Sequence, residues 1–273
     1  MSVTSERSSE RRSDDRRRGE RRLRRPLDEP LIRFEDIWKS FGSTSIYEGL
    51  DLTVHKGETI TIVGGSGTGK SVLLKCLLGL LRPDRGRIEA FGEEVTGRSE
   101  RQMGEIRARI GMLFQGAALF DSLCVADNVA YPLRVRGWHD EARIAGRVAE
   151  VLEMVNLPGL ERQWPASLSG GMKKRVGLAR AIAIEPEVIL YDEPTTGLDP
   201  TNVKRIDQLI IDLQERLGVT SIVVTHDMDS AFRVSDRLAM LYERKIVWCG
   251  FKDEVESADN PVVRAFIDGN IGD

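Results

Sequence analysis

The chain has 273 residues, 41% of them hydrophobic and 30% charged, and a formal net charge of -3, which is typical of a globular protein with a core of normal depth. No apolar run approaches the roughly 18 residues that a membrane helix needs, and the charged N-terminal stretch has no apolar segment that predicts a secretory signal. Cys76, Cys124 and Cys249 lie far apart without CxxC spacing, which argues against a disulfide framework or a cysteine metal site and favours a reducing compartment.

Residues 1–25 contain ten arginines and five acidic residues but almost no apolar side chain. Such a segment cannot offset the entropy cost of ordering, so we expect a disordered leader over residues 1–30. Its excess of positive charge suits anionic lipid headgroups or nucleic acid, although the interspersed acids weaken either attraction. A solvated leader without a partner is the equal alternative.

The predicted folded part begins near residue 31 with two strands, 31–38 and 47–54, joined by a turn at Gly42 and Ser43. These strands predict an antiparallel β layer. Phe41 lies in the connection, where its ring is either a stacking surface for a nucleobase or a packing residue.

A glycine-rich loop then joins a β-branched run, 59–63, to a leucine-rich helix that starts near Lys70. This GxxxxGKS pattern between a strand and a helix is a P-loop, and it predicts a nucleoside triphosphate site. Glycine N–H groups and the positive end of the helix surround the phosphates. Lys70 reaches the β- and γ-phosphates, and the Ser71 hydroxyl is placed to bind Mg²⁺. The residues of the loop are Gly64, Gly65, Ser66, Gly67, Thr68, Gly69, Lys70 and Ser71.

The following segment predicts a short strand at 87–91, a helix at 98–107 and a buried strand at 110–114. From residue 116 to about 167 the pattern contains no further strand, and residues 140–157 carry apolar side chains on one helical face. We therefore expect an inserted helical subdomain.

A parallel-sheet pattern resumes with apolar strands at 188–191 and 220–225. Asp192 and Glu193 follow the first strand, and His226 follows the second. Because the carboxyl ends of parallel strands form the ligand crevice, we expect these side chains to lie beside the P-loop.

Gln115 ends its own strand at the same predicted edge. Asp192 is predicted to hold Mg²⁺, with Gln115 as a neutral further ligand of the metal or its water. Glu193 is predicted to be the general base for the attacking water, and His226 to hydrogen-bond the γ-phosphate and link it to Glu193.

The rest of the chain predicts alternating helices and strands. These are a helix at 202–217 stopped by Gly218, strands at 238–242 and 245–248, and a final helix with Asn260 as cap, Pro261 in its first turn and Gly269 as stop.

A second anion-binding helix end is predicted at residues 168–172, LSGGM, ahead of a helix at 173–184. Ser169, Gly170 and Gly171 would face a phosphate there. Since one nucleotide does not ordinarily need two such sites in one chain, we expect these residues to face the γ-phosphate held by another copy.

Together the residues resemble the nucleotide-binding subunits of ABC transporters. The matching motifs in chain order are an A-loop-like Phe41, the Walker A residues 64–71, the Q-loop Gln115, the signature 168–172, the Walker B carboxylates Asp192 and Glu193, the D-loop 197–200 with Asp199, and the switch His226. The resemblance implies an α/β P-loop NTPase with a RecA-like core, an antiparallel β layer and a helical subdomain at about 97–170. It implies an ATPase domain over 31–273 with a C-terminal extension from about 250.

The same resemblance implies a head-to-tail homodimer that encloses two ATP molecules with Mg²⁺ between Walker A of one copy and the signature of the other. Ser169, Gly170, Gly171 and Asp199 are the expected contributions of the second copy. Met172 stands where most relatives have Gln, and we expect little loss of nucleotide binding because Ser169 and Gly171 are the phosphate-facing positions.

More narrowly, residues 114–120, 128–133, 168–172 and 263–269 resemble the ATPases of MCE- or Mla-type phospholipid transporters. That resemblance implies a separate membrane permease that docks near residues 115–132, an MCE-domain protein, an accessory subunit and a place at the cytoplasmic face of the inner membrane. The alternatives are the ATPase of a small-solute importer, such as one for amino acids, and a soluble ABC ATPase that acts on nucleic acid. We expect no nucleic-acid partner, because the chain has neither a second ATPase domain nor a long coiled-coil insertion.

Overall fold

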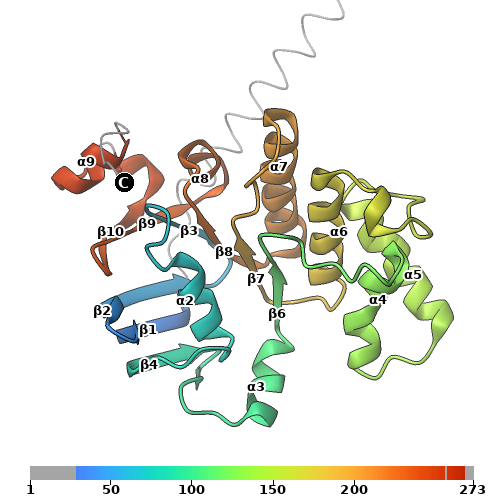
Figure 1. Ribbon diagram of the computed structural model, residues 1–273, viewed down its shortest axis with the longest axis horizontal. Helices are drawn as coiled ribbons and strands as arrows, with labels where there is room; N and C mark the ends of the chain where they lie inside the picture. The colour runs from blue at the N-terminus through green and yellow to red at the C-terminus, as the bar shows by residue number, and fades with distance from the viewer. Residues whose placement is uncertain (1–28, 256, 268–273) are drawn as a thin grey trace, which may run out of the picture.

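A computed structural model describes residues 29–255 and 257–267 (Figure 1). The strands are β1 (Pro30–Phe41), β2 (Thr44–His55), β3 (Thr59–Val63), β4 (Arg85–Ala90), β5 (Glu93–Glu94), β6 (Ile110–Leu113), β7 (Val188–Asp192), β8 (Thr220–Thr225), β9 (Arg237–Tyr242) and β10 (Lys245–Phe251). The α-helices are α2 (Lys70–Leu77), α3 (Glu100–Arg107), α4 (Val125–Val135), α5 (Glu141–Met154), α6 (Gly170–Ile182), α7 (Pro200–Leu217), α8 (Met228–Val234) and α9 (Pro261–Ile267). Short 3-10 helices are η1 (Pro165–Ser167) and η2 (Lys252–Glu254).

The central sheet of the described region has six strands in the order β10-β9-β3-β8-β7-β6. Its strands from β9 to β6 pair in parallel, and β10 adds an antiparallel edge. All residues of β3, β7 and β8 are buried, as their continuous apolar and β-branched composition predicts for parallel strands covered on both faces. The predicted parallel sheet is therefore confirmed.

The predicted antiparallel layer is also confirmed. In the described region β1 pairs with β2 and β4 in an antiparallel four-stranded sheet of order β2-β1-β4-β5. Alternate side chains such as Ile32 and Phe34 are buried, and they join a core with Leu73 and Leu77 of α2 and with Ile62 of β3. Helix α2 thus lies between the two sheets, and burial of its leucines fixes where its N-terminus points.

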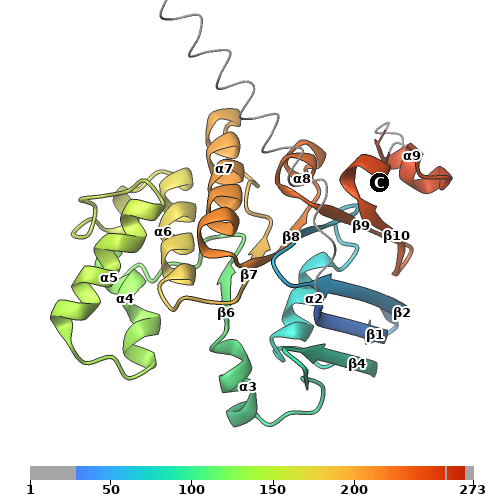
Figure 2. The same ribbon diagram turned by 180° about the vertical axis from the view of Figure 1, so that it is seen from behind.

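Helices α4 and α5 stand at one end of the molecule, and the antiparallel sheet stands at the other (Figures 1 and 2). Ile144, Val148 and Leu152 of α5 are buried in a cluster with Val129 of α4 and Val176 of α6. Strand β6, which falls inside the predicted insertion, pairs with β7 in the central sheet. The helices that stand apart from the sheet are therefore α4 and α5, and the outer limits of the subdomain stay a prediction.

Several local predictions differ from the structure. Helix α6 begins at Gly170 rather than at 173, because Ser169 already caps it by accepting a hydrogen bond from the Met172 N–H. Helix α8 and the two-residue strand β5 were not predicted. Gly218 ends α7 in the left-handed conformation as predicted.

At the C-terminal end, Asn260 accepts hydrogen bonds from the N–H groups of Val262 and Val263, which confirms it as a cap of α9. The predicted stop at Gly269 and the predicted leader over 1–30, apart from its last two residues, lie outside the described residues. None of the helices in the described ranges has both the length and the apolarity to span a bilayer.

Candidate active site

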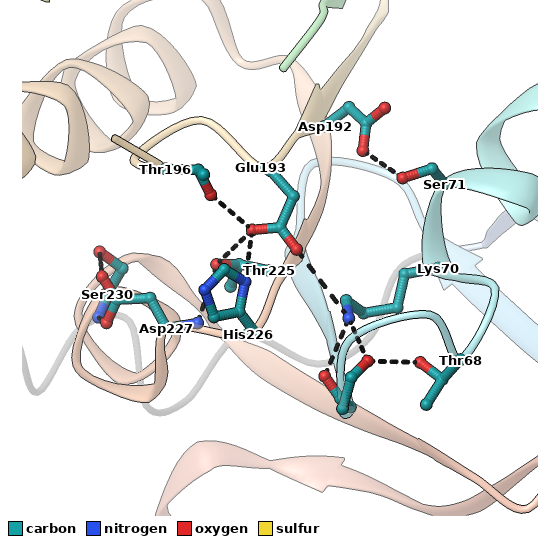
Figure 3. A network of polar contacts seen from close by, with 12 residues as sticks. Thr68, Lys70, Ser71, Asp192, Glu193, Thr196, Thr225, His226, Asp227 and Ser230 are labelled. Atoms are coloured by element: carbon teal, nitrogen blue, oxygen red, sulfur yellow. Dashed lines mark hydrogen bonds and ion pairs between the residues drawn. The ribbon is translucent and has the colours of Figure 1, made fainter. Parts of the chain in front are cut away.

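Three parallel strands bring the predicted site residues to one edge of the central sheet (Figure 3). Val63, the last residue of β3, pairs with Thr225 of β8, and Asp192 of β7 pairs with Val224. The P-loop, the carboxylate pair and His226 therefore all follow neighbouring strands at their carboxyl ends. This juxtaposition is the one that the strand pattern predicts.

The P-loop needs glycine at two positions for different reasons. A Cβ on Gly64 would lie 2.5 Å from the carbonyl oxygen of Leu241 in β9. Gly69 has a φ of 103°, and a Cβ there would lie 2.5 Å from Cγ2 of Ile46. The Tyr47 hydroxyl fixes the same turn by donating a hydrogen bond of 2.5 Å to the Gly69 carbonyl. The loop is thus held in shape by the strands that surround it.

Gly64→Ala is therefore expected to lower the free energy of unfolding by about 1–3 kcal/mol and to weaken ATP binding, because β9 must move to admit the methyl group. Gly104→Ala is the matched control, since Gly104 lies in α3 with open space around its Cα. That change should raise stability by about 0.5–1 kcal/mol. Thermal unfolding with and without ATP measures both, and equal melting temperatures for wild type and Gly64→Ala would contradict the expectation.

Lys70 lies at the centre of the loop with only 6% of its surface exposed. Its Nζ donates hydrogen bonds of 2.8 Å to the carbonyls of Gly64 and Gly65 and lies 3.9 Å from Oε1 of Glu193. Burial lowers the pKa of Lys70, and the charges of Glu193 and Asp192 act in the opposite direction. Thr68 closes the turn by donating 2.9 Å to the Gly65 carbonyl. The arrangement places a buried cation between the loop carbonyls and the Glu193 carboxylate.

Ser71 and Asp192 form a pair of hard oxygen donors beside Lys70. The Ser71 hydroxyl donates a hydrogen bond of 2.5 Å to Oδ1 of Asp192. Mg²⁺ is usually held by one or two protein oxygens, with phosphate oxygens and waters completing the shell. Groups of three or more metal-binding His, Cys, Asp or Glu side chains are absent from the described ranges. The two oxygen donors therefore fit Mg²⁺ that arrives with a triphosphate.

Glu193 is the most constrained residue of the site. Its backbone has a φ of 47°, which is unusual for a residue with a side chain. Oε2 accepts a hydrogen bond of 3.0 Å from the Thr196 hydroxyl and lies 2.9 Å from Nδ1 of His226. The other oxygen faces Lys70. The carboxylate is thus aimed between the P-loop cation and the imidazole, as Figure 3 shows.

Lys174 completes this environment from helix α6, and it was not predicted. It is 5% exposed, and its Nζ donates 3.0 Å to the main-chain oxygen of Glu193. The available signal was its place on the buried face of the helix, three residues after Gly171 and four before Leu178. A lysine on such a face requires a partner, because an unpaired ammonium is costly to bury.

The signature and D-loop residues pack against each other. A Cβ on Gly171 would lie 2.8 Å from Oδ1 of Asn202. Asn202 in turn donates a hydrogen bond of 2.5 Å to Asp199, which caps α7 and also accepts from the Thr201 N–H. These hydrogen bonds lower the pKa of Asp199, and the one from the Asn202 side chain has the largest effect. Within the described residues no hydrogen bond joins Ser169 to the P-loop of its own chain.

Two predicted residues stand outside the network. Gln115 is exposed two residues beyond β6 and makes no hydrogen bond to the carboxylates within the described chain. Phe41, at the end of β1, is 47% exposed, and its ring centroid lies 5.3 Å from Nζ of Lys39. The structure therefore leaves the metal role of Gln115 and the stacking role of Phe41 as predictions.

Comparisons with known proteins agree on one family. The family profile described as ABC transporter matches residues 47–196. The probable ribonucleotide transport ATP-binding protein Mkl of Mycobacterium tuberculosis is 43% identical over 238 residues, which cover 87% of this chain and 66% of Mkl. The chain thus spans slightly less than two thirds of that relative.

Two further relatives match at 42% identity. They are the chloroplastic protein trigalactosyldiacylglycerol 3 of Arabidopsis thaliana, with coverage of 88% and 74%, and the methionine import ATP-binding protein MetN 2 of Rhodococcus jostii, with 87% and 71%. Among solved structures, the dimeric ATP-binding cassette MJ0796 bound to ADP and Pi has a TM-score of 0.75 at 30% identity and covers 81% of this chain and 99% of that cassette.

Proposed function

The chain belongs to the ABC transporter family, whose ATP-binding subunits are ATPases, and we propose on this premise that it hydrolyses ATP to drive phospholipid transport through a separate membrane permease. The observation that carries the ATPase part is the contact network at the sheet edge. It places a P-loop lysine, a carboxylate and an imidazole around one point.

In the proposed mechanism Lys70 leaves the carbonyls of its own loop to bind the phosphates of ATP. Glu193 accepts a proton from the attacking water, and the three groups beside its Oε2, Thr196, Thr225 and His226, hold that carboxylate in position. Mg²⁺ held near Ser71 and Asp192 would neutralise phosphate charge. The protein's own contribution is therefore orientation and proton acceptance.

We further propose that two copies close head to tail around two ATP molecules. The tips of α6 and α7, with Ser169, Gly171 and Asp199, would then face the nucleotide of the partner. The dimeric form of the MJ0796 cassette supports this arrangement. Packing of Gly171 against Asn202 supports it as well, because it makes the two tips one surface.

A permease contact is proposed at the segment that follows Gln115. Phe120 and Tyr131 are 42% and 45% exposed, and their ring centroids lie 4.8 Å apart. Asn128, fully buried below them, accepts from the Phe120 N–H and donates to the carbonyls of Phe120, Leu123 and Cys124. This side chain holds the loop so that the aromatic pair stays on the surface, which suits an apolar partner.

Phospholipid is proposed as the cargo because residues 114–120, 128–133, 168–172 and 263–269 resemble those of MCE- and Mla-type ATPases. The names of the relatives point in several directions, to ribonucleotide transport, to a galactolipid and to methionine import. An MCE-domain protein and an accessory subunit are proposed as further partners. The proposed place of the chain is the cytoplasmic face of the inner membrane.

The test is affinity purification of the tagged full chain from detergent-solubilised membranes, followed by identification of bound polypeptides and lipids. Co-purification of a multispanning subunit, an MCE-domain protein and phospholipid is expected. A permease found with a methionine-binding or other solute-binding protein would instead identify a small-solute importer. ATP turnover that is stimulated by nucleic acid, with no membrane partner, would contradict transport altogether.

A further inference from the structure

A buried cation connects the signature helix to the residue taken here as the catalytic base. Lys174 belongs to α6, is 5% exposed and reaches the main-chain oxygen of Glu193 at 3.0 Å. No step of the proposed hydrolysis uses this lysine. Its ammonium is nevertheless buried away from water, and the free-energy cost of burying that charge must be offset by other interactions.

The compensation comes from the charges around it. Burial lowers the pKa of Lys174, and the carboxylates of Asp192 and Glu193 oppose that effect. The two acids of the site therefore offset part of the cost of burying this ammonium. Replacing it with an apolar side chain would change the field at both carboxylates and remove a donor from the main chain of Glu193.

The main-chain oxygen that Lys174 contacts belongs to Glu193, whose backbone conformation is unusual. Glu193 has a φ of 47°, and such conformations persist only where the surroundings determine them. The Glu193 N–H donates 2.9 Å to the carbonyl of Val224, and the Glu193 carbonyl accepts from Lys174 and, at 3.4 Å, from the Thr196 N–H. Of these partners, Lys174 alone comes from an element whose first turn is the signature segment.

We propose that Lys174 is a positioning residue that holds the Glu193 main chain and so ties the direction of its carboxylate to the tip of α6. This inference rests on the proposed function, because it takes Glu193 as the base and Ser169 as a residue that faces the partner's nucleotide. Lys174 lies five residues after Ser169, or about 7.5 Å along a rigid helix. Movement of the tip when it meets the partner's nucleotide therefore displaces the turn that carries the base.

The test compares three variants of the full chain in ATP turnover, ATP binding and thermal unfolding. Lys174→Met keeps the length of the side chain but loses the charge and the donor, and we expect kcat to fall by about 10–100-fold, as for small displacements of a catalytic group. The dissociation constant for ATP should stay within about twofold, because the hydrogen bond of Lys174 goes to the main chain of Glu193 and not to the loop that binds the phosphates. Lys174→Arg keeps charge and donors and should recover most of the lost kcat.

Lys173→Met is the matched control, since it makes the same change at the neighbouring position of the same helix, and its kcat should equal that of wild type. Unchanged kcat in Lys174→Met would overturn the proposal. So would a parallel loss of kcat, ATP affinity and melting temperature in both Lys174 variants, because that pattern marks a merely structural lysine. A wild-type chain with no ATP turnover would refute the proposed function instead, and that result is read from wild type alone.

Discussion

Glu193→Gln is expected to reduce ATP turnover by about 10²–10⁴-fold, the contribution typical of a positioned general base. The amide has nearly the shape of the carboxylate and keeps an oxygen that accepts from Thr196, so the turn and the hydrogen bond of 3.0 Å can persist. It cannot take a proton from water at neutral pH. The variant therefore separates proton acceptance from geometry.

ATP binding should be unchanged in Glu193→Gln, because Lys70 and the loop N–H groups are untouched. Since the bound ATP is not hydrolysed, the ATP-bound dimer should accumulate. Steady-state phosphate release, nucleotide titration and size-exclusion chromatography with ATP measure the three quantities. Glu215→Gln, at an exposed position of α7, is the control and should behave as wild type. Turnover of Glu193→Gln within about threefold of wild type would remove Glu193 as the base.

The sheet and the edge where the site forms were predictable because strands buried on both faces have a recognisable sequence pattern. Residues 188–191 and 220–225 read as continuous apolar or β-branched runs, and such runs occur in strands of parallel sheets. Once those strands are parallel neighbours, the residues after them must meet. The approach of Glu193 to His226 thus follows from topology, whereas the 2.9 Å distance does not.

The start of α6 was mispredicted because propensity and packing conflict there. The prediction placed Ser169 and both glycines ahead of a helix that begins at Lys173, and glycine is indeed a poor helix former. In the structure the Ser169 cap starts the helix at Gly170, and the side chain of Asn202 leaves no room for a Cβ on Gly171. The capping residue Ser169 was the available signal for the start of the helix. The contact of Asn202 with Gly171 comes from α7, and the local sequence could not predict it.

Helix α8 carried a similar signal. Asp227 accepts a hydrogen bond from the Ser230 N–H and caps the helix, so the residue after the switch histidine fixes where that helix starts. The helical face of Lys174 signalled its burial, but nothing local pointed to its partner, because that partner lies 19 residues away in a turn. The hydrophobic periodicity of a single sequence predicts helices and strands, but it does not predict which side chains of separate elements contact each other.

Lys70→Ala is expected to weaken ATP binding by at least about 100-fold, equivalent to roughly 2.7 kcal/mol. Hydrogen bonds from a charged donor to phosphate are among the strongest in proteins, and Lys70 is the cation of the loop, where its Nζ donates to the carbonyls of Gly64 and Gly65. The change also removes the positive charge 3.9 Å from Oε1 of Glu193. Titration with a fluorescent ATP analogue measures the affinity directly.

Lys75→Ala makes the matched change on the exposed face of the same helix α2, and its ATP affinity should equal that of wild type. Thermal unfolding without nucleotide separates a binding defect from a folding defect, since Lys70 also bonds the carbonyls of Gly64 and Gly65. A Lys70→Ala protein that melts like wild type but binds ATP as tightly would show that glycine N–H groups and helix dipole suffice, and the P-loop lysine would lose its assigned role.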